Sequence, residues 1–442
     1  MRSYQALQAK RLFIRGKHIV GIDPAKAKHQ AVVIDPDGIQ LGKSFTFKTD
    51  HSGYTETLWK KIGKVLEKIN PEDVVFAIER SCNLWLTLSE YLNRKGYKVL
   101  LISPVVTRRS RPFINQDFSR TDPKDALLVA SSARDGYFNY YRKYSPDIEA
   151  MHRLGIAYDK LRKNCIQQQH RIRSLVEALF PEFFEVLNLD TKSGLYILER
   201  YLTPQDFIEM DIAKEARALE VLSNRAHGQE SLEKLQMLAH QSIGCPRHAE
   251  EIMADRLMLD SWLSLLKPVQ QAMDKIIKEL ITLAEQSPCF EILCSLKGVS
   301  KKMAGLFIAE VRDPYLFDHY KKVEKMAGVN LRLSQSGNTS GPRHISHMGN
   351  NRLRWVFFKM TEETAKYIPE VRIKFLKRQL KKGCYKKNLM AATPQMLKLI
   401  MTLIKENRPY EYRQETLKEM KRLEEKYEQR KKQTSRKKRQ AA

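Results

Sequence analysis

Two closely spaced acids of this 442-residue chain have a pattern that could do chemistry. Asp122 and Asp125 lie in the stretch "RTDPKDALLVA", where Thr121 can cap a helix and Pro123 can occupy its first turn. Residues three positions apart share one face of a helix, so these two side chains should point in the same direction. Acids in a first helical turn also suit the helix dipole without any further role, so the pair alone is ambiguous.

Two further acids end strands that should be buried. Asp23 ends "HIVGID" and Glu79 ends "VVFAIE", and both stretches are apolar enough to lie in the centre of a sheet. A carboxylate in such a place is costly unless it is paired or binds a metal. If these two strands are neighbours, as in ribonuclease H-like folds, all four acids gather at one end of the sheet.

The chemistry expected of such a cluster is metal-assisted. Four carboxylates held together repel one another, and a divalent cation keeps them stable while all are ionised. Oxygen ligands suit hard ions, which favours Mg²⁺ or Mn²⁺ held by Asp23, Glu79, Asp122 and Asp125. Two such ions about 4 Å apart can activate a nucleophile and stabilise the leaving oxygen of a phosphodiester. We therefore predict cleavage of a nucleic-acid backbone.

A polar, glycine-rich loop, "NLRLSQSGNTSGPRHISHMGNNRLRW", is a second candidate site. Glycines let the main chain approach a phosphate, and arginines can hold it through paired hydrogen bonds. Ser334, Ser336 and Ser340 are candidate nucleophiles, although Ser-Gly pairs also form ordinary turns. The predicted phosphate contacts of this loop are Arg332, Arg343, His344, Arg352 and Arg354.

The stretch "LCSLKGVSKKMAGLFIAEV" predicts a helix end, a glycine turn and a new helix. It is similar to helix-hairpin-helix motifs, whose turn offers main-chain N–H groups to phosphate, but a plain helix connection has the same pattern. The candidate contacts of this hairpin are Lys297, Lys301 and Lys302. Further basic candidates lie nearer the N-terminus: Lys26, Arg108, Arg109 and Arg111.

Composition agrees with a nucleic-acid partner. Lys and Arg number 78 against 51 Asp and Glu, a net charge of +27, while 42% of residues are hydrophobic. A folded protein of this charge favours a polyanion. No apolar run approaches the roughly 20 residues that span a bilayer, so we expect a cytoplasmic, nucleoid-associated protein without membrane contact. The six cysteines form no CxxC pair and are expected to be ordinary reduced thiols.

The order of predicted elements gives the fold class. Three strands within residues 18–47 form a meander, and a helix at about 54–69, a strand at 73–79, a helix at 84–95 and a strand at 97–103 follow. This order predicts an α/β ribonuclease H-like domain with a mixed sheet. Two long helical stretches, 151–187 and 249–285, could pair as a coiled-coil arm, with a less regular segment between them.

We therefore predict four parts. They are a catalytic α/β domain at 1–140, a helical arm at 141–288, a C-terminal α-helical domain at 289–405 that carries the hairpin and the serine loop, and a basic helical tail at 406–442. The tail is either a solvated end or a nucleic-acid clamp.

Several of these stretches resemble one known family. "GIDPAKAKHQAVV", "AIERSCNLWLTLSEYLNRKGYKVLLISP" and "RTDPKDALLVA" resemble the RuvC-like DEDD domain of transposases of insertion-sequence family 110, a group that includes the Piv/MooV-type DNA invertases. Residues 295–360 are similar to the C-terminal transposase domain of that family, and "LRKNCIQQQHRIRSLVEALFPEF" to its linking helix. The resemblance covers about residues 17–180 and 290–370.

The resemblance implies roles for particular residues. Asp23, Glu79, Asp122 and Asp125 match the DEDD metal ligands, and Ser336 matches the serine that attacks the DNA phosphate. It implies a DNA transposase or site-specific recombinase guided by a structured RNA from its own element. It also implies a homo-oligomer, a dimer or tetramer, in which the serine of one subunit completes the metal site of another. A serine nucleophile keeps the phosphodiester energy in a covalent link, so strands can be rejoined.

Three other interpretations stay open. A RuvC-type structure-selective endonuclease would use the same four acids with water as its nucleophile. An actin-like or sugar-kinase ATPase also ends its first strand in Asp, but the glycine-rich phosphate loops of that fold are not visible. In a non-catalytic nucleic-acid binder, the acids would only cap helices.

Overall fold

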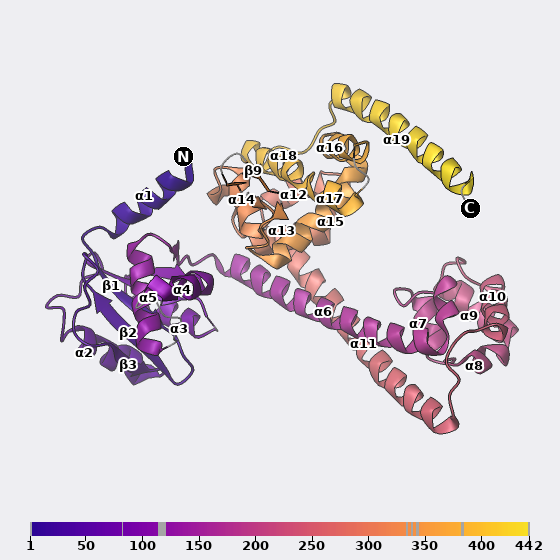
Figure 1. Ribbon diagram of the computed structural model, residues 1–442, viewed down its shortest axis with the longest axis horizontal. Helices are drawn as coiled ribbons and strands as arrows, with labels where there is room; N and C mark the ends of the chain where they lie inside the picture. Colours follow the sequence, from indigo (N-terminus) through magenta and orange to yellow (C-terminus); the bar gives the residue numbers. More distant parts are fainter. Residues whose placement is uncertain are drawn as a thin grey trace. The chain divides into compact units, whose positions relative to one another are not determined.

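The computed structural model describes residues 2–81, 83–113, 121–332, 335–336, 339–341, 344–381 and 384–440. Its internal contacts divide the chain into two compact units, residues 1–143 and 144–442 (Figure 1). The first unit is α/β and the second is almost entirely helical. Each unit is described by itself below.

A six-stranded mixed sheet forms the centre of the first unit, in the order β3-β2-β1-β4-β5-β6. The strands are β1 (His18–Asp23), β2 (Lys28–Ile34), β3 (Phe45–Lys48), β4 (Val74–Glu79), β5 (Lys98–Ile102) and β6 (Asn139–Tyr140). β1 pairs antiparallel with β2 and parallel with β4, and β5 continues the parallel part. The predicted mixed sheet is confirmed, and its order is consistent with a RuvC-like domain.

Local chemistry explains where the observed elements differ from the predicted ones. The third strand begins only at Phe45, because Gly42 has a φ of +67° and cannot continue an extended strand. The helix predicted at 54–69 ends at Ile62, where Gly63 forms its C-cap. The edge strand β6 has two residues, too few to show an alternating pattern in the sequence. The helices of this unit are α1 (Arg2–Ile14), α2 (Leu58–Ile62), which follows a π-helical turn (Gly53–Thr57), α3 (Leu84–Arg94), α4 (Pro104–Ser110) and α5 (Asp122–Arg134).

The helix α5 lies against the sheet at one glycine. A Cβ atom on Gly21 of β1 would lie 2.5 Å from the carbonyl oxygen of Ala126 and 2.6 Å from the Cβ of Ala130, both in α5. Glycine therefore permits a helix–strand approach that no other residue allows. This contact sets the distance of α5, with its two acids, from β1.

Gly21→Ala is expected to lower the free energy of unfolding by about 1–3 kcal/mol, because it overpacks a contact with backbone atoms that cannot move aside. Gly63→Ala is the matched control: its φ is −64°, and the nearest atom to its new Cβ is a carbonyl oxygen at 3.3 Å. That control should change stability by less than about 0.5 kcal/mol. Urea denaturation followed by circular dichroism measures both, and equal stabilities would contradict the packing argument.

Two long helices dominate the second unit. α6 (Pro146–Leu179) and α11 (Ala249–Ala284) lie side by side, in agreement with the predicted pair of long helices (Figure 1). One hydrophobic core includes the C-terminal half of α6 and the N-terminal half of α11, and a second core includes their opposite halves.

The segment between these helices is more regular than its sequence indicates. It forms α7 (Lys192–Leu198), α8 (Pro204–Ile208), α9 (Ile212–Leu222) and α10 (Gln229–His240). The side chains of Thr191, Thr203 and Asp211 cap the first three of these helices. The ring of Phe180, the C-cap of α6, lies 4.9 Å from that of Phe207 in α8 at a tilt of 50°, and both rings belong to the core. Short capped helices lack the long period by which sequence analysis finds helices.

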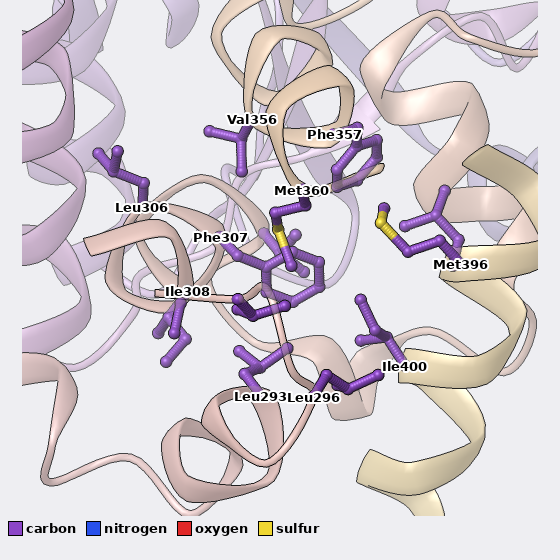
Figure 2. Close-up of a cluster of buried hydrophobic side chains, with 14 of the residues drawn as sticks. Leu293, Leu296, Leu306, Phe307, Ile308, Val356, Phe357, Met360, Met396 and Ile400 are labelled. Carbon is purple, nitrogen blue, oxygen red and sulfur yellow. The ribbon is translucent and has the colours of Figure 1, made fainter. Parts of the chain in front are cut away.

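The C-terminal helices enclose the other core. They are α12 (Cys289–Cys294), α13 (Lys301–Val311), α14 (Tyr320–Ala327), α15 (Asn351–Tyr367), α16 (Pro369–Gln379), α17 (Tyr385–Met390) and α18 (Thr393–Glu406). Figure 2 shows Phe307, Phe357 and Met360 at the centre of this core, with Met396 and Ile400 of α18 on one side. The tail forms α19 (Gln414–Gln440), which packs on α16 with an Arg372–Glu424 ion pair of 2.9 Å.

Candidate functional site

The strand register places two predicted acids next to each other. β1 and β4 are parallel, and Ile22 of β1 lies opposite Ile78 of β4. Asp23 and Glu79 are the next residues of the two strands, so they end neighbouring strands at the carboxyl edge of the sheet. Glu79 is 8% exposed and Asp23 is half-buried.

The helix α5 carries the other two acids. It begins at Asp122, with Thr121 as the N-cap in an extended conformation and Pro123 in the first turn, as predicted. The Thr121 side chain makes no capping hydrogen bond. Asp125 is 1% exposed, whereas Asp122 is exposed at the helix start.

Arg111 joins three of these acids. Its Nε and Nη2 atoms each donate to one carboxylate oxygen of Asp125, at 2.9 Å and 2.9 Å. This hydrogen-bonded pairing, together with the negative charges of Asp125, Glu79 and Asp23, raises the pKa of the Arg111 guanidinium. Three of the four predicted acids therefore lie within electrostatic reach of one cation. The sequence predicted Arg111 as a nucleic-acid contact, and that role stays a prediction.

The donor atoms fit a hard divalent cation in type, because they are carboxylate oxygens and two of the groups are buried. Within the part of the chain that the structure describes, no group of three or more His, Cys, Asp or Glu residues is arranged to hold a metal ion. Arg111 engages both oxygens of Asp125, and Asp122 is exposed one helical turn earlier. The structure thus brings Asp23, Glu79 and Asp125 near one guanidinium, and the four-acid metal site stays a prediction.

His29 supports the site and was missed by the sequence analysis. This fully buried residue of β2 accepts a hydrogen bond at Nδ1 from the N–H of Ala25, two residues after Asp23. Its Nε2 atom lies 2.9 Å from the hydroxyl of Tyr54, and since Nδ1 is an acceptor, Nε2 carries the proton and donates. Burial lowers the pKa of His29 to about 4. The sequence feature that could have identified His29 is a histidine at an inward-facing position of an apolar strand.

This histidine should make the first unit sensitive to acid. An unfolded His titrates near pH 6.5 and folded His29 near pH 4, so between these values the unfolded state binds the extra proton. Stability should therefore fall as the pH drops from 6.5 to 4, by a contribution on the order of 3 kcal/mol. Urea denaturation at several pH values measures the slope. His29→Gln should flatten it and the exposed control His51→Gln should not; a slope unchanged by His29→Gln would contradict the assignment.

The serine loop forms two short antiparallel pairs. β7 (Leu331–Arg332) pairs with β10 (His344–Ile345), and β8 (Gln335–Ser336) pairs with β9 (Thr339–Ser340). The backbone of Ser336 lies opposite Thr339 in the inner pair. Two predicted residues of this loop lie outside the described residues: Ser334 and Arg343.

A buried acid anchors the end of this loop. Glu310 of α13 is 1% exposed and accepts hydrogen bonds from Nε of Arg352, at 2.6 Å, and from the amide of Asn350. Arg354 donates to the carbonyl oxygens of Ala327 and His347, at 3.0 and 3.3 Å. Two arginines predicted to contact phosphate therefore tie the loop to α13 and α14. The sequence analysis did not predict a role for Glu310. Its signal was a single acid within the apolar stretch "AGLFIAEV", because a buried acid needs a positively charged or hydrogen-bonding partner.

The other predicted basic residues differ in their surroundings. Lys301 pairs with Glu285 at 2.8 Å, and Lys297 and Lys302 lie over aromatic rings. The hairpin that carries them has the predicted helix–turn–helix form, with Gly298 at a φ of +100°. The remaining described candidates are exposed: Lys26, Arg108, Arg109, Arg332 and His344.

Comparison with known protein families identifies the family of this chain. Residues 20–181 match the family DEDD_Tnp_IS110, described as a transposase, and residues 290–374 match the transposase IS116/IS110/IS902 family. The chain belongs to the IS110 family of transposases. An IS110-family transposase acts on DNA, which agrees with the basic composition. The two matches contain every predicted acid and the serine loop.

Two relatives extend along most of this transposase. It is 24% identical over 370 residues to the insertion element IS116 uncharacterized 44.8 kDa protein of Streptomyces clavuligerus, covering 79% of this chain and 85% of the relative. It is 22% identical over 325 residues to the insertion element IS110 uncharacterized 43.6 kDa protein of Streptomyces coelicolor, covering 72% and 78%. Across the described ranges, no helix has the length and apolar character needed to cross a membrane.

Proposed function

We propose that this transposase cuts and rejoins DNA at the ends of an insertion sequence, with Ser336 as the nucleophile and a divalent metal at the sheet-edge carboxylates. One observation carries the proposal. Asp23, Glu79 and Asp125 converge on a single guanidinium at the carboxyl edge of a mixed sheet, inside the segment that matches the DEDD family. Buried acids at a strand end are costly, which favours a functional reason for them.

The four acids would hold Mg²⁺ or Mn²⁺, with Asp23 and Glu79 from the strands and Asp122 and Asp125 from α5. When bound, such an ion stabilises negative charge on the phosphodiester oxygens that react. The chain itself holds Asp125 in place through Arg111. His29 holds the backbone that follows Asp23.

Ser336 would supply the covalent step. Its hydroxyl oxygen forms a bond to phosphorus while the bond from phosphorus to one DNA oxygen breaks, and that oxygen takes up the proton released by the hydroxyl. A hydroxyl of another strand then reverses the exchange, which rejoins the DNA and restores the serine. The backbone pairing of Ser336 with Thr339 supports this role, because it lies within the polar, glycine-rich loop whose main chain can approach a phosphate.

The proposed partners are DNA, a structured guide RNA from the same element, and further copies of this chain. The net charge of +27 supports two nucleic-acid partners. An apolar stripe along α11 supports a homo-oligomer, a dimer or tetramer, because Met253, Leu257 and Leu265 are exposed on one long helix. A second copy of the helix would cover such a stripe.

One observation favours a second candidate, the RuvC-type endonuclease with water as the nucleophile. The carboxylates belong to unit 1–143, whereas Ser336 belongs to unit 144–442. A single unit could thus carry all the groups that a hydrolytic nuclease needs.

Recombination on a plasmid separates the two functions. A supercoiled plasmid with the element ends and a target is incubated with the protein and the RNA transcribed beside the gene. We expect rejoined recombinant junctions with Mg²⁺, none with EDTA, and recovery when Mg²⁺ is restored. Nicked or linear products without junctions would overturn the proposal in favour of the nuclease.

A further inference from the structure

An open cavity of about 710 Å³ lies beside the turn between α12 and α13. Its walls come from the turn, from α6 through Tyr158, and from one side of α15 through Trp355, Lys359 and Tyr367. All of its lining residues belong to unit 144–442, whereas the carboxylates belong to the other unit. The volume lies within the roughly 300–1,000 Å³ of small-molecule sites, which is enough for a nucleotide.

Three aromatic side chains line this cavity. The rings of Tyr158 and Trp355 lie 6.5 Å apart at an angle of 43°, and Tyr367 is exposed at the rim. Lys302 lies 4.8 Å from the centre of the Tyr158 ring, and Lys297 lies 5.0 Å from that of Tyr367. Aromatic faces beside basic groups are the combination that proteins use to stack unpaired bases along a charged backbone.

The charges of the lining select for an anion. Lys359 pairs with Glu362 at 2.7 Å and the one lining acid, Glu363, pairs with Lys366 at 2.8 Å, so Lys297 and Lys302 supply the positive charge of the lining. A cationic ligand would be repelled, and a purely apolar ligand would leave the ammonium groups desolvated. A ligand that is both flat and negatively charged satisfies the whole lining. A nucleotide has both properties.

The turn that forms the wall is held in one conformation. A Cβ atom on Gly298 would lie 2.9 Å from the main chain of Glu363 and 3.1 Å from the Tyr367 ring, so the turn presses against α15. On its other side, the Ser300 hydroxyl accepts a hydrogen bond from the N–H of Met303 and caps α13. Because this wall is already ordered before a ligand binds, less conformational entropy is lost on binding.

We propose that this cavity, named here the turn cavity, binds one unpaired nucleotide of a nucleic-acid strand. The base stacks on the exposed ring of Tyr367, beside Trp355, whose ring already carries the Arg162 guanidinium at 4.3 Å, and the phosphate lies near Lys297 and Lys302. Base-paired nucleotides cannot enter, because their faces are covered by neighbouring pairs. The inference rests on the proposed action on nucleic acid, but not on the chemistry assigned to the carboxylates or to Ser336.

Binding by the whole protein in EDTA tests this proposal without any strand cleavage. The probes are a fluorescent oligothymidylate and an oligonucleotide of the same length made only of abasic sites, which has the same phosphates and no bases. We expect the probe with bases to bind about 5- to 150-fold more tightly, the range for stacking one base. Trp355→Leu and Tyr367→Ser should each reduce this ratio, whereas Tyr315→Ser, which removes an exposed aromatic ring outside the cavity, should not.

A ratio that survives in both cavity variants would overturn the proposal. Trp355 also contacts the core. If Trp355→Leu fails to fold for this reason, the result for Tyr367→Ser, at an exposed residue, decides the test. Photocrosslinking of a 5-iodouridine probe should label a peptide with Trp355 or Tyr367, and labelling elsewhere alone would also overturn it. The same probes made as RNA and DNA distinguish a guide strand from an element or target strand. If the protein binds the probe with bases more tightly than the abasic probe but forms no recombinant junctions, only the proposed catalysis is refuted.

Discussion

Asp23→Asn should reduce DNA strand cleavage at least about 100-fold, since removing a single charge-stabilising group from an active site costs roughly that much. The substitution keeps the size of a half-buried side chain at the end of β1 and removes only its charge. Folding and DNA affinity should therefore change little. The rate of plasmid cleavage with Mg²⁺ and the melting temperature measure the two effects.

Asp135→Asn is the matched control for this experiment. Asp135 is the C-cap of α5, and its carboxylate lies 3.5 Å from Arg134 on the surface. It should cleave like the parent protein. If Asp23→Asn also cleaved at the parental rate, the carboxylates would be structural, and the non-catalytic interpretation of the acids would stand.

Ser336→Ala should abolish both the covalent protein–DNA adduct and the rejoined junctions, because the proposed covalent link that keeps the phosphodiester energy is made through the Ser336 hydroxyl. Substrate quenched with detergent and resolved on a denaturing gel shows the adduct as labelled DNA that migrates with protein. Ser340→Ala is the control, since Ser340 belongs to the same short antiparallel strand pair, opposite Gln335. Cleavage that persists at the normal rate in Ser336→Ala would show that water is the nucleophile.

Strand and long-helix patterns were predictable from the sequence because they depend on local periodicity. "HIVGID" and "VVFAIE" form β1 and β4, and the parallel pairing that brings Asp23 beside Glu79 follows from the order of elements. The helix that starts at Asp122 was equally local. The family resemblance named the four acids and the serine, and the comparisons support the family.

The remaining features depend on contacts between distant residues. Nothing in the spacing of Arg111 and Asp125 shows that a guanidinium will bind both oxygens of that acid, because Arg111 follows α4, Asp125 lies in α5, and the pair depends on how these two helices pack. The same holds for Glu310 and Arg352, which lie in different helices. Arg111 and Arg352, which the sequence analysis predicted as phosphate contacts, instead form ion pairs with these acids.

The Arg111–Asp125 pair limits how the proposed metal ion could bind. Arg111 and a divalent ion both carry positive charge near Asp23, Glu79 and Asp125, so each weakens the other's attraction to the carboxylates. A bound ion would be favoured where Asp23 and Glu79 hold it and the guanidinium stays on Asp125. The strand-end acids are therefore the ones whose loss should affect metal affinity most.

Titration of the whole protein with Mn²⁺, followed by electron paramagnetic resonance of the free ion, tests the central claim most directly. The account predicts saturable Mn²⁺ binding by the parent protein and by Asp135→Asn, and its loss in the double variant Asp23→Asn with Glu79→Gln. Identical binding curves for the parent and the double variant would contradict the claim that these carboxylates hold the metal.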